Sequence, residues 1–275
     1  MFRLFTTLIV SALLATGAFA QDAKRSIAKI AGDVYRFQNN FHFNIFVVTP
    51  DGVVVTDPIN KEAAEWLKAE IGKITDQPIK YLIYSHSHGD HASGGAVYTD
   101  TAEVIAHKNA PEAIDGVAPT TRFDDAHTVK LGGKTIELSF LGKGHGNDLI
   151  AMVVRPENVA FAVDAVSVNR LPFRDFPRAD IGGIINQIKA VEGLDFDILS
   201  PGHGKMGVKS DATAHREYVE KLMASVKAGL KAGKSVDDLL TELTLDEYAG
   251  WGSFKAFREP NIRGMARWLK ESGGI

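Results

Sequence analysis

The sequence contains no cysteine, which excludes disulfide bonds, a thiolate nucleophile, thiolate-bound zinc and cysteine-ligated iron–sulfur clusters. It also lacks an excess of basic residues: the net charge is −3 and the pI is near 6.3. A nucleic-acid partner is therefore not expected, because phosphate binding requires a basic surface. What is present is a chain of 275 residues, 45% hydrophobic and 24% charged, which is ordinary for a globular protein of one large domain or two small ones.

The first 20 residues have the pattern of a secretory signal peptide. Arg3 supplies a positive charge, the mostly apolar run from Leu4 to Thr16 follows, and Ala18-Phe19-Ala20 is a small-x-small cleavage site. The alternative is a retained anchor, but the run is short for a bilayer span, and no later segment is apolar enough. We therefore expect export to the periplasm, removal of residues 1–20 and a mature domain of residues 21–275 without a membrane anchor.

Strands and helices alternate along the mature chain. Three pairs of apolar runs are separated by turn sequences, Pro50-Asp51-Gly52, Gly132-Gly133 and Arg155-Pro156-Glu157-Asn158, and each pair predicts a β-hairpin. Single short strands are predicted at 79–84, 104–106 and 197–199. Helical spacing of apolar residues predicts helices, and these cover residues 61–74, 181–191, 213–230 and 261–270. Hairpins mixed with helices favour a layered α+β fold over a strict βαβ repeat.

Two segments of the chain resemble each other. VVTPDGVVVTDP at 47–58 and VVRPENVAFAVD at 153–164 share a strand, a turn containing proline, a second strand and a terminal aspartate, within one residue of register. An internal duplication would predict two similar halves whose sheets face each other. The alternative is that two unrelated hairpins merely look alike, since repeats are normally recognised from stronger similarity.

The densest cluster of possible metal ligands is in YSHSHGDHASGG, residues 84–95. His86, His88, Asp90 and His91 directly follow the apolar strand at 79–84. Side chains two residues apart in an extended chain point to the same side, and Gly89 then allows the backbone to turn. So short a loop cannot easily give all four ligands to one metal, but two adjacent metals could share them. A solvated polar loop is the alternative, and clustered His and Asp after a buried strand favour the metal site.

The motif His-x-His-x-Asp-His after a strand resembles the signature of the metallo-β-lactamase superfamily, over roughly residues 27–203. The resemblance implies three further ligands: His145 in LGKGHGNDLI, Asp164 at a strand end and His203 in LSPGHG. It also implies the fold, a four-layer αββα sandwich of the α+β class with the metals at one edge between the sheets.

The resemblance further implies roles for these residues. His86, His88 and His145 would give one zinc three neutral nitrogens and an open position, as in catalytic sites. Asp90, His91 and His203 would hold a second metal, and Asp164 would bridge the two. Two zinc ions per chain are expected, although the same ligands suit iron. The cations would acidify a shared water, and the hydroxide would attack a carbonyl carbon, with Asp90 as the catalytic residue that orients it or transfers its proton.

The implied activity is hydrolysis of a small ester, lactone, thioester or amide. Two subclasses of true metallo-β-lactamase need a cysteine ligand, which this chain lacks. The cysteine-free subclass remains an alternative, but it usually lacks the bridging aspartate. The same ligands would also serve an iron-dependent persulfide dioxygenase, or a noncatalytic, metal-dependent binding or assembly protein of the periplasm.

Four histidines lie outside the motif: His42, His107, His127 and His215. His215 falls on the long amphipathic helix, where a surface position is expected, and a structural role is favoured for His107. In the segment 37–43, Phe41 and Phe43 could form an apolar lid, or could simply alternate along a strand. In the segment 171–178, Arg174 could bind a carboxylate or form a surface ion pair.

Overall fold

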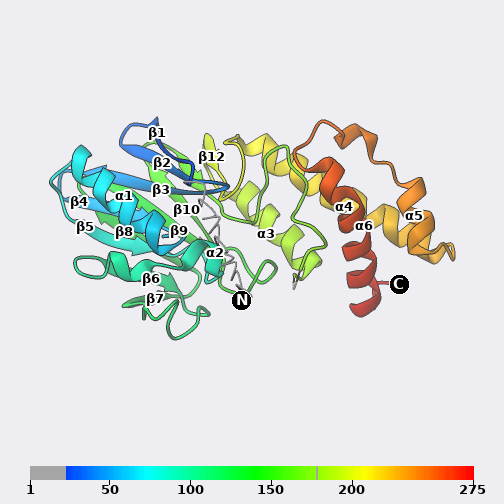
Figure 1. Ribbon diagram of the computed structural model, residues 1–275. Helices are drawn as coiled ribbons and strands as arrows, with labels where there is room; N and C mark the ends of the chain where they lie inside the picture. The colour runs from blue at the N-terminus through cyan, green and yellow to red at the C-terminus, as the bar shows by residue number, and fades with distance from the viewer. Residues whose placement is uncertain (1–22, 178) are drawn as a thin grey trace, which may run out of the picture.

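The computed structural model describes residues 23–177 and 179–275, so the expected signal peptide lies outside the described residues. The structure contains two sheets, which lie together on the left in Figure 1, with the C-terminal helices to their right. The larger sheet contains seven strands in the order β1 to β7, antiparallel from β1 to β4 and parallel from β4 to β7. Its strands are β1 (Arg25–Ala31), β2 (Val34–Asn39), β3 (His42–Thr49), β4 (Gly52–Thr56), β5 (Ile79–Ile83), β6 (Glu103–His107) and β7 (Thr121–Phe123).

The second sheet has five strands in the order β12-β11-β10-β9-β8, all antiparallel except the β11–β12 pair. They are β8 (Ala126–Leu131), β9 (Lys134–Phe140), β10 (Ile150–Arg155), β11 (Val159–Phe161) and β12 (Ile198–Ser200). The helices are α1 (Lys61–Ile74), α2 (Gly89–Ala92), α3 (Ile181–Gly193), α4 (Lys209–Lys231), α5 (Val236–Glu242) and α6 (Phe254–Glu271), with short 3₁₀ turns η1 (Gly95–Val97) and η2 (Asp246–Tyr248). No helix in the described ranges is long and apolar enough to span a membrane.

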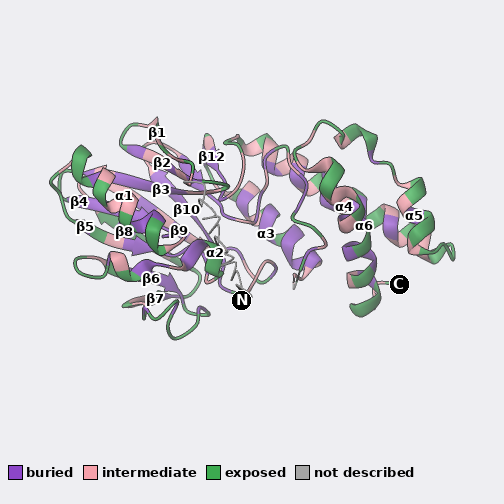
Figure 2. Ribbon diagram, viewed as in Figure 1, coloured by how far each residue is buried: buried purple, intermediate pink, exposed green. Residues whose placement is uncertain are grey.

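Three apolar layers hold these elements together, and the central strands contribute to two layers each. In β3, Ile45 and Val47 point into the layer between the sheets, whereas Phe46 points to the layer beneath α1. In β10, Met152 faces the other sheet and Val153 faces the layer under α3, α4 and α6. A strand that is buried on both faces is apolar at nearly every position, as in β10, whose residues from Ile150 to Val154 are all buried. Figure 2 shows much of the two sheets in the colour of buried residues. The expected four-layer αββα sandwich is confirmed.

The predicted hairpins are all present, and the two similar segments lie on different sheets. Residues 47–58 contain the β3–β4 hairpin, and residues 153–164 contain the β10–β11 hairpin. Val54 of the first hairpin and Val154 of the second belong to the same layer between the sheets. The facing arrangement therefore agrees with the expectation, while the duplication itself stays a prediction.

The surface position expected for His215 is wrong. His215 is 3% exposed on α4, beside the buried Ala212 and Val219. Its Nδ1 accepts a hydrogen bond from the backbone N–H of Ser167 at 3.2 Å, in the segment that follows β11. His215 lies three and four residues before Tyr218 and Val219, on the apolar face of α4, and the chain after β11 packs against it there.

His215 should make the stability of the fold depend on pH. Burial lowers the pKa of His215 to about 4, from an ordinary value near 6.5. The folded chain therefore binds fewer protons than the unfolded chain between these values, so stability falls as the pH drops through them, by up to about 3 kcal/mol. Urea unfolding at pH 7 and pH 5, with a chelator present, should show a smaller pH dependence in His215→Asn, whose amide oxygen can replace Nδ1. An equal pH dependence in both proteins would contradict a neutral buried His215.

Candidate metal centre

The seven expected site residues come together where strands of both sheets end. His86 and His88 follow β5, and α2 carries Asp90 and His91 directly afterwards. The other three come from the second sheet: His145 lies between β9 and β10, Asp164 follows β11, and His203 follows β12. Because these ends meet at one edge of the sandwich, residues up to 117 positions apart in the chain become neighbours.

One group of donors consists of His86, His88, His145 and Asp164, whose ligand atoms all lie within 4.8 Å of one another. Nε2 of His145 is 2.9 Å from Nδ1 of His88 and 3.1 Å from Oδ2 of Asp164. Nε2 of His86 is 3.5 Å from the same Asp164 oxygen. Three imidazoles and one carboxylate oxygen thus converge on one point.

A second group consists of Asp90, His91, His203 and, in addition, His42. Nε2 of His91 and Nε2 of His203 are 3.0 Å apart, and Oδ2 of Asp90 lies 3.6 Å and 3.8 Å from them. The other Asp164 oxygen, Oδ1, is 3.3 Å from His203 and 3.6 Å from His91. Asp164 therefore contacts both groups, one with each oxygen.

The donors have the chemistry of a metal site. Nε2 of His86 is buried without a hydrogen-bond partner among the described residues, a costly arrangement unless a cation lies in front of it. Burial holds the pKa of His86 well below its usual value, so the imidazole is neutral, as a ligand must be. Burial also lowers the pKa of His91, but Asp164, Asp57 and Asp90 together raise it to about 9. The carboxylates thus attract positive charge to this point.

Comparisons with known proteins agree with this geometry. The sequence model of the metallo-β-lactamase superfamily matches residues 40–203, more than half of the chain. The chain belongs to the metallo-β-lactamase superfamily. It is 24% identical over 241 residues to 2,4-dinitroanisole O-demethylase subunit alpha of Nocardioides sp. (strain JS1661), covering 82% of this chain and 73% of the relative. It is 28% identical to metallo-beta-lactamase type 2 of Elizabethkingia meningoseptica, covering 52% of this chain and 64% of the relative.

The fold is also that of solved members of the superfamily. A metallo-beta-lactamase from Pontibacter korlensis superposes with a TM-score of 0.64 at 21% identity, covering 72% of this chain and 99% of that protein. The superfamily match ends at residue 203. Helices α4, α5 and α6 follow that point.

Asp57 supports the centre and was not predicted from the sequence. Its carboxylate is fully buried and accepts hydrogen bonds from the backbone N–H and the hydroxyl of Ser85, at 2.7 Å and 2.6 Å. It also lies 3.7 Å from Nδ1 of His91. Burial raises its pKa to about 6. A signal was present, because Asp57 ends the first of the two similar segments as Asp164 ends the second.

The turn that carries His203 is held by β2. The guanidinium of Arg36 donates to the carbonyls of Pro201 and Gly204 at 3.0 Å and 2.9 Å, and lies 3.6 Å from the centre of the Phe43 ring. Phe43 is thus a strand residue covered by Arg36. Phe41, in contrast, is 78% exposed, and its carbonyl accepts a hydrogen bond from Nδ1 of His203. Of the two phenylalanines, Phe41 is therefore the one exposed to solvent.

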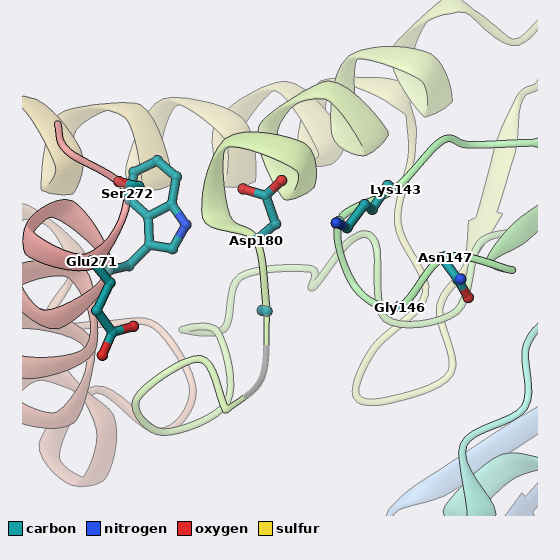
Figure 3. A pocket seen from close by; sticks show the side chains of 9 residues that line it. Lys143, Gly146, Asn147, Asp180, Glu271 and Ser272 are labelled. Atoms are coloured by element: carbon teal, nitrogen blue, oxygen red, sulfur yellow. The ribbon is translucent and has the colours of Figure 1, made fainter.

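A cavity of about 530 Å³ borders the loop that carries His145. Its walls come from that loop, the start of α3 and the end of α6, and in Figure 3 Asp180 lies between Lys143 and Glu271. The metal donors are not among its lining residues, so it adjoins the centre without containing it. Arg174, in the segment before α3, has no carboxylate within 4.0 Å among the described residues, and its guanidinium lies 5.0 Å from the Phe173 ring. Binding of a carboxylate by Arg174 stays a prediction.

Gln187 of α3 fixes the loop that carries His145. The side chain is fully buried; its Oε1 accepts from the backbone N–H of His145 at 2.7 Å, and its Nε2 donates to the carbonyl of Gly142 at 2.8 Å. The loop lies directly on the helix, since a Cβ on Gly144 would be 2.5 Å from the carbonyl carbon of Gly183. One amide side chain thus sets the position of a first-group donor.

Replacing Gln187 by methionine, which is of similar length but makes neither hydrogen bond, should weaken metal binding at the first group. A loss of roughly 10- to 100-fold in affinity is expected, as for other supports of metal ligands. Competition with a chromogenic chelator measures it, and Lys189→Met on the same helix is the control, because Lys189 pairs with Glu220 instead. Equal affinities in Gln187→Met and the wild type would show that the loop holds its position without Gln187.

Proposed function

We propose that this protein is a hydrolase that binds two metal ions, zinc by preference, and cleaves a small ester, lactone, thioester or amide. The contact of Asp164 with both donor groups supports this proposal, because a carboxylate shared in this way would bridge two adjacent cations. When bound, a pair of zinc ions supplies an acidified water and polarises a carbonyl group. An all-histidine and aspartate donor set suits zinc, and it also suits iron.

The proposed roles of the site residues follow from how exposed their side chains are. His86 and His91 are buried, the side chain of Asp164 is only 12% exposed, and these three residues would hold the cations in place. Asp90 is on the open side, with its side chain 52% exposed and Oδ2 turned toward the imidazoles of the second group. Without a bound cation, a hydrogen bond from His42 is the largest influence that keeps the pKa of Asp90 below its ordinary value. An ionised Asp90 can orient a water molecule and accept its proton.

The substrate would approach from the side of Asp90 and Phe41. Both side chains are exposed there, and Phe41 is joined to His203 through its backbone carbonyl. An exposed phenyl ring beside polar donors favours a substrate with an apolar part next to its scissile bond.

A substrate panel on the protein loaded separately with zinc and with iron tests the proposal. The panel should contain an aryl ester, a lactone, a thioester, an amide and a β-lactam. It should also contain an activated aryl methyl ether, because one relative is named as an O-demethylase. Hydrolysis by the zinc form is expected. Oxygen uptake with a persulfide by the iron form would favour the dioxygenase, and no turnover with both cations bound would favour a binding protein.

A further inference from the structure

We infer that His42 is a fourth side-chain ligand at the second group, together with Asp90, His91 and His203. His42 precedes the His-x-His-x-Asp-His motif by more than forty positions, and no part of the motif predicts it. One of its ring nitrogens nevertheless lies within 4.8 Å of the ligand atoms of the other three residues, the Asp90 oxygen and the two histidine nitrogens. The inference rests on the two-cation centre proposed above and concerns which residues of this chain complete it.

The distances match those of ligands that share one metal. Two donors bound tetrahedrally at about 2.0–2.1 Å from zinc are about 3.4 Å apart. Nε2 of His42 lies 3.4 Å from Oδ2 of Asp90. The rings of His42 and His203 are 4.7 Å apart between their centres and meet at 66°, which lets their nitrogens point to a common position.

The backbone on both sides of His42 is fixed to the turn that carries His203. The N–H of Phe43 donates to the carbonyl of Gly202 at 2.9 Å. On the other side, Nδ1 of His203 is 2.9 Å from the carbonyl of Phe41. That carbonyl requires the proton to be on Nδ1, which leaves Nε2 of His203 unprotonated for a metal. His42 thus starts β3 at a set distance from a residue already assigned to the second group.

The other histidines outside the motif have different surroundings. His107 stacks on Phe140 with 3.8 Å between the ring centres, and its Nδ1 accepts from the backbone of Asn109. His127 lies on β8 and stacks on Phe123. Neither belongs to a donor group in the described part of the chain. His127 therefore offers a matched control for the loss of an imidazole.

A fourth ligand has a measurable consequence for metal binding. Asp164 contacts both groups, so the second group would have five protein donors and the first would have four. In the wild type the second cation should therefore be the more tightly held. Without His42 it should bind at least about 10-fold more weakly, while the first cation keeps its affinity.

The test is a titration of the metal-free protein with Co²⁺, followed by its visible absorption spectrum, together with zinc competition against a chelator. His42→Ala and His42→Phe are compared with His127→Ala; the phenylalanine keeps a ring but offers no nitrogen. We expect two tight equivalents in the wild type and His127→Ala. In both His42 variants we expect one tight and one weakened equivalent, with a changed spectrum for the weak one.

Three results would count against the inference. If the second cation binds both His42 variants with wild-type affinity and spectrum, His42 only donates a hydrogen bond to Asp90, and the two-cation centre stands without it. If the wild type binds a single cation at saturation, the two-cation centre and this inference both fail. If His127→Ala loses the second cation equally, the effect belongs to the fold and not to a ligand. Lack of hydrolysis by a fully loaded wild type would overturn the proposed activity alone.

Discussion

Asp164→Asn should reduce the number of tightly bound cations from two to at most one. The carboxylate reaches His145 with one oxygen, at 3.1 Å, and His203 with the other, at 3.3 Å. Although burial opposes its charge, His91 and His145 hold the pKa of Asp164 well below its usual range. The amide removes the negative charge and replaces one ligand oxygen by an N–H donor. Affinity at the weaker group should fall by at least about 100-fold, because a direct ligand matters more than its supports.

Asparagine is the suitable replacement because of the backbone. Asp164 has φ of +56°, in the left-handed region that asparagine and aspartate tolerate better than other non-glycine residues. The variant should therefore keep the turn after β11 and lose only the charge. Equilibrium dialysis with zinc measures the stoichiometry, and thermal unfolding should show a smaller metal-induced rise in Tm.

Glu157→Gln is the control for removing a buried carboxylate. Its side chain is 6% exposed and pairs with Lys134, which also pairs with Asp33, and none of these residues belongs to a donor group in the described chain. We expect this variant to be less stable but to bind two cations. Two tight cations in Asp164→Asn would contradict the bridging role and would leave the two groups as independent sites.

The layers of the fold could be predicted from the sequence because local patterns determine them. The turn Pro50-Asp51-Gly52 lies between two apolar runs and connects β3 to β4, as predicted. Asn60 caps α1 by accepting from the N–H of Ala63, and the predicted bounds of this helix match the observed ones, Lys61–Ile74. In these elements the turn and cap residues and the apolar pattern indicate the same local structure, so the prediction is consistent at both levels.

Elements at the edges of the sheets were missed for a physical reason. β1 and β7 are the outer strands of the larger sheet, and β1 contains Lys29 and other exposed residues. An edge strand buries less surface, so its sequence need not be a continuous apolar run. β2 was also not predicted, since Arg36 and Gln38 interrupt its apolar residues; Arg36 extends from it to the turn of His203.

The site could be predicted only where spacing along the chain is informative. The motif from His86 to His91 and the three later candidate ligands were predicted from the sequence, and the structure brings all seven side chains together. No sequence motif or spacing identifies His42 or Gln187 as part of the site. Each acquires its position through contacts with residues far away in the chain, His42 with Asp90 and Gln187 with His145. Contacts between residues more than forty positions apart form only when the sheets assemble, so no local sequence pattern predicts them.

Asp90→Asn should lower kcat by roughly 10²- to 10⁴-fold on the substrate identified by the panel, the usual contribution of a positioned acid–base group. The change keeps the size and one ligand oxygen but removes the charge and the ability to accept a proton. KM should change much less, since the lost interaction is made mainly in the transition state. The matched control is Asp100→Asn, which removes an exposed carboxylate paired with Lys68 and should leave kcat unaltered.

The metal content of Asp90→Asn must be measured in the samples used for kinetics, because Asp90 belongs to the second donor group. Oδ2 of Asp90 lies within 3.4–3.8 Å of nitrogens of His42, His91 and His203, and the side chain is 52% exposed, so Asp90 would serve both as a metal ligand and as an accessible base in the proposed reaction. A lower kcat caused by an empty second group should recover when zinc is added in excess. A lower kcat caused by the loss of proton transfer should persist with both groups filled. Turnover near that of the wild type in the fully loaded variant would assign Asp90 to metal binding alone.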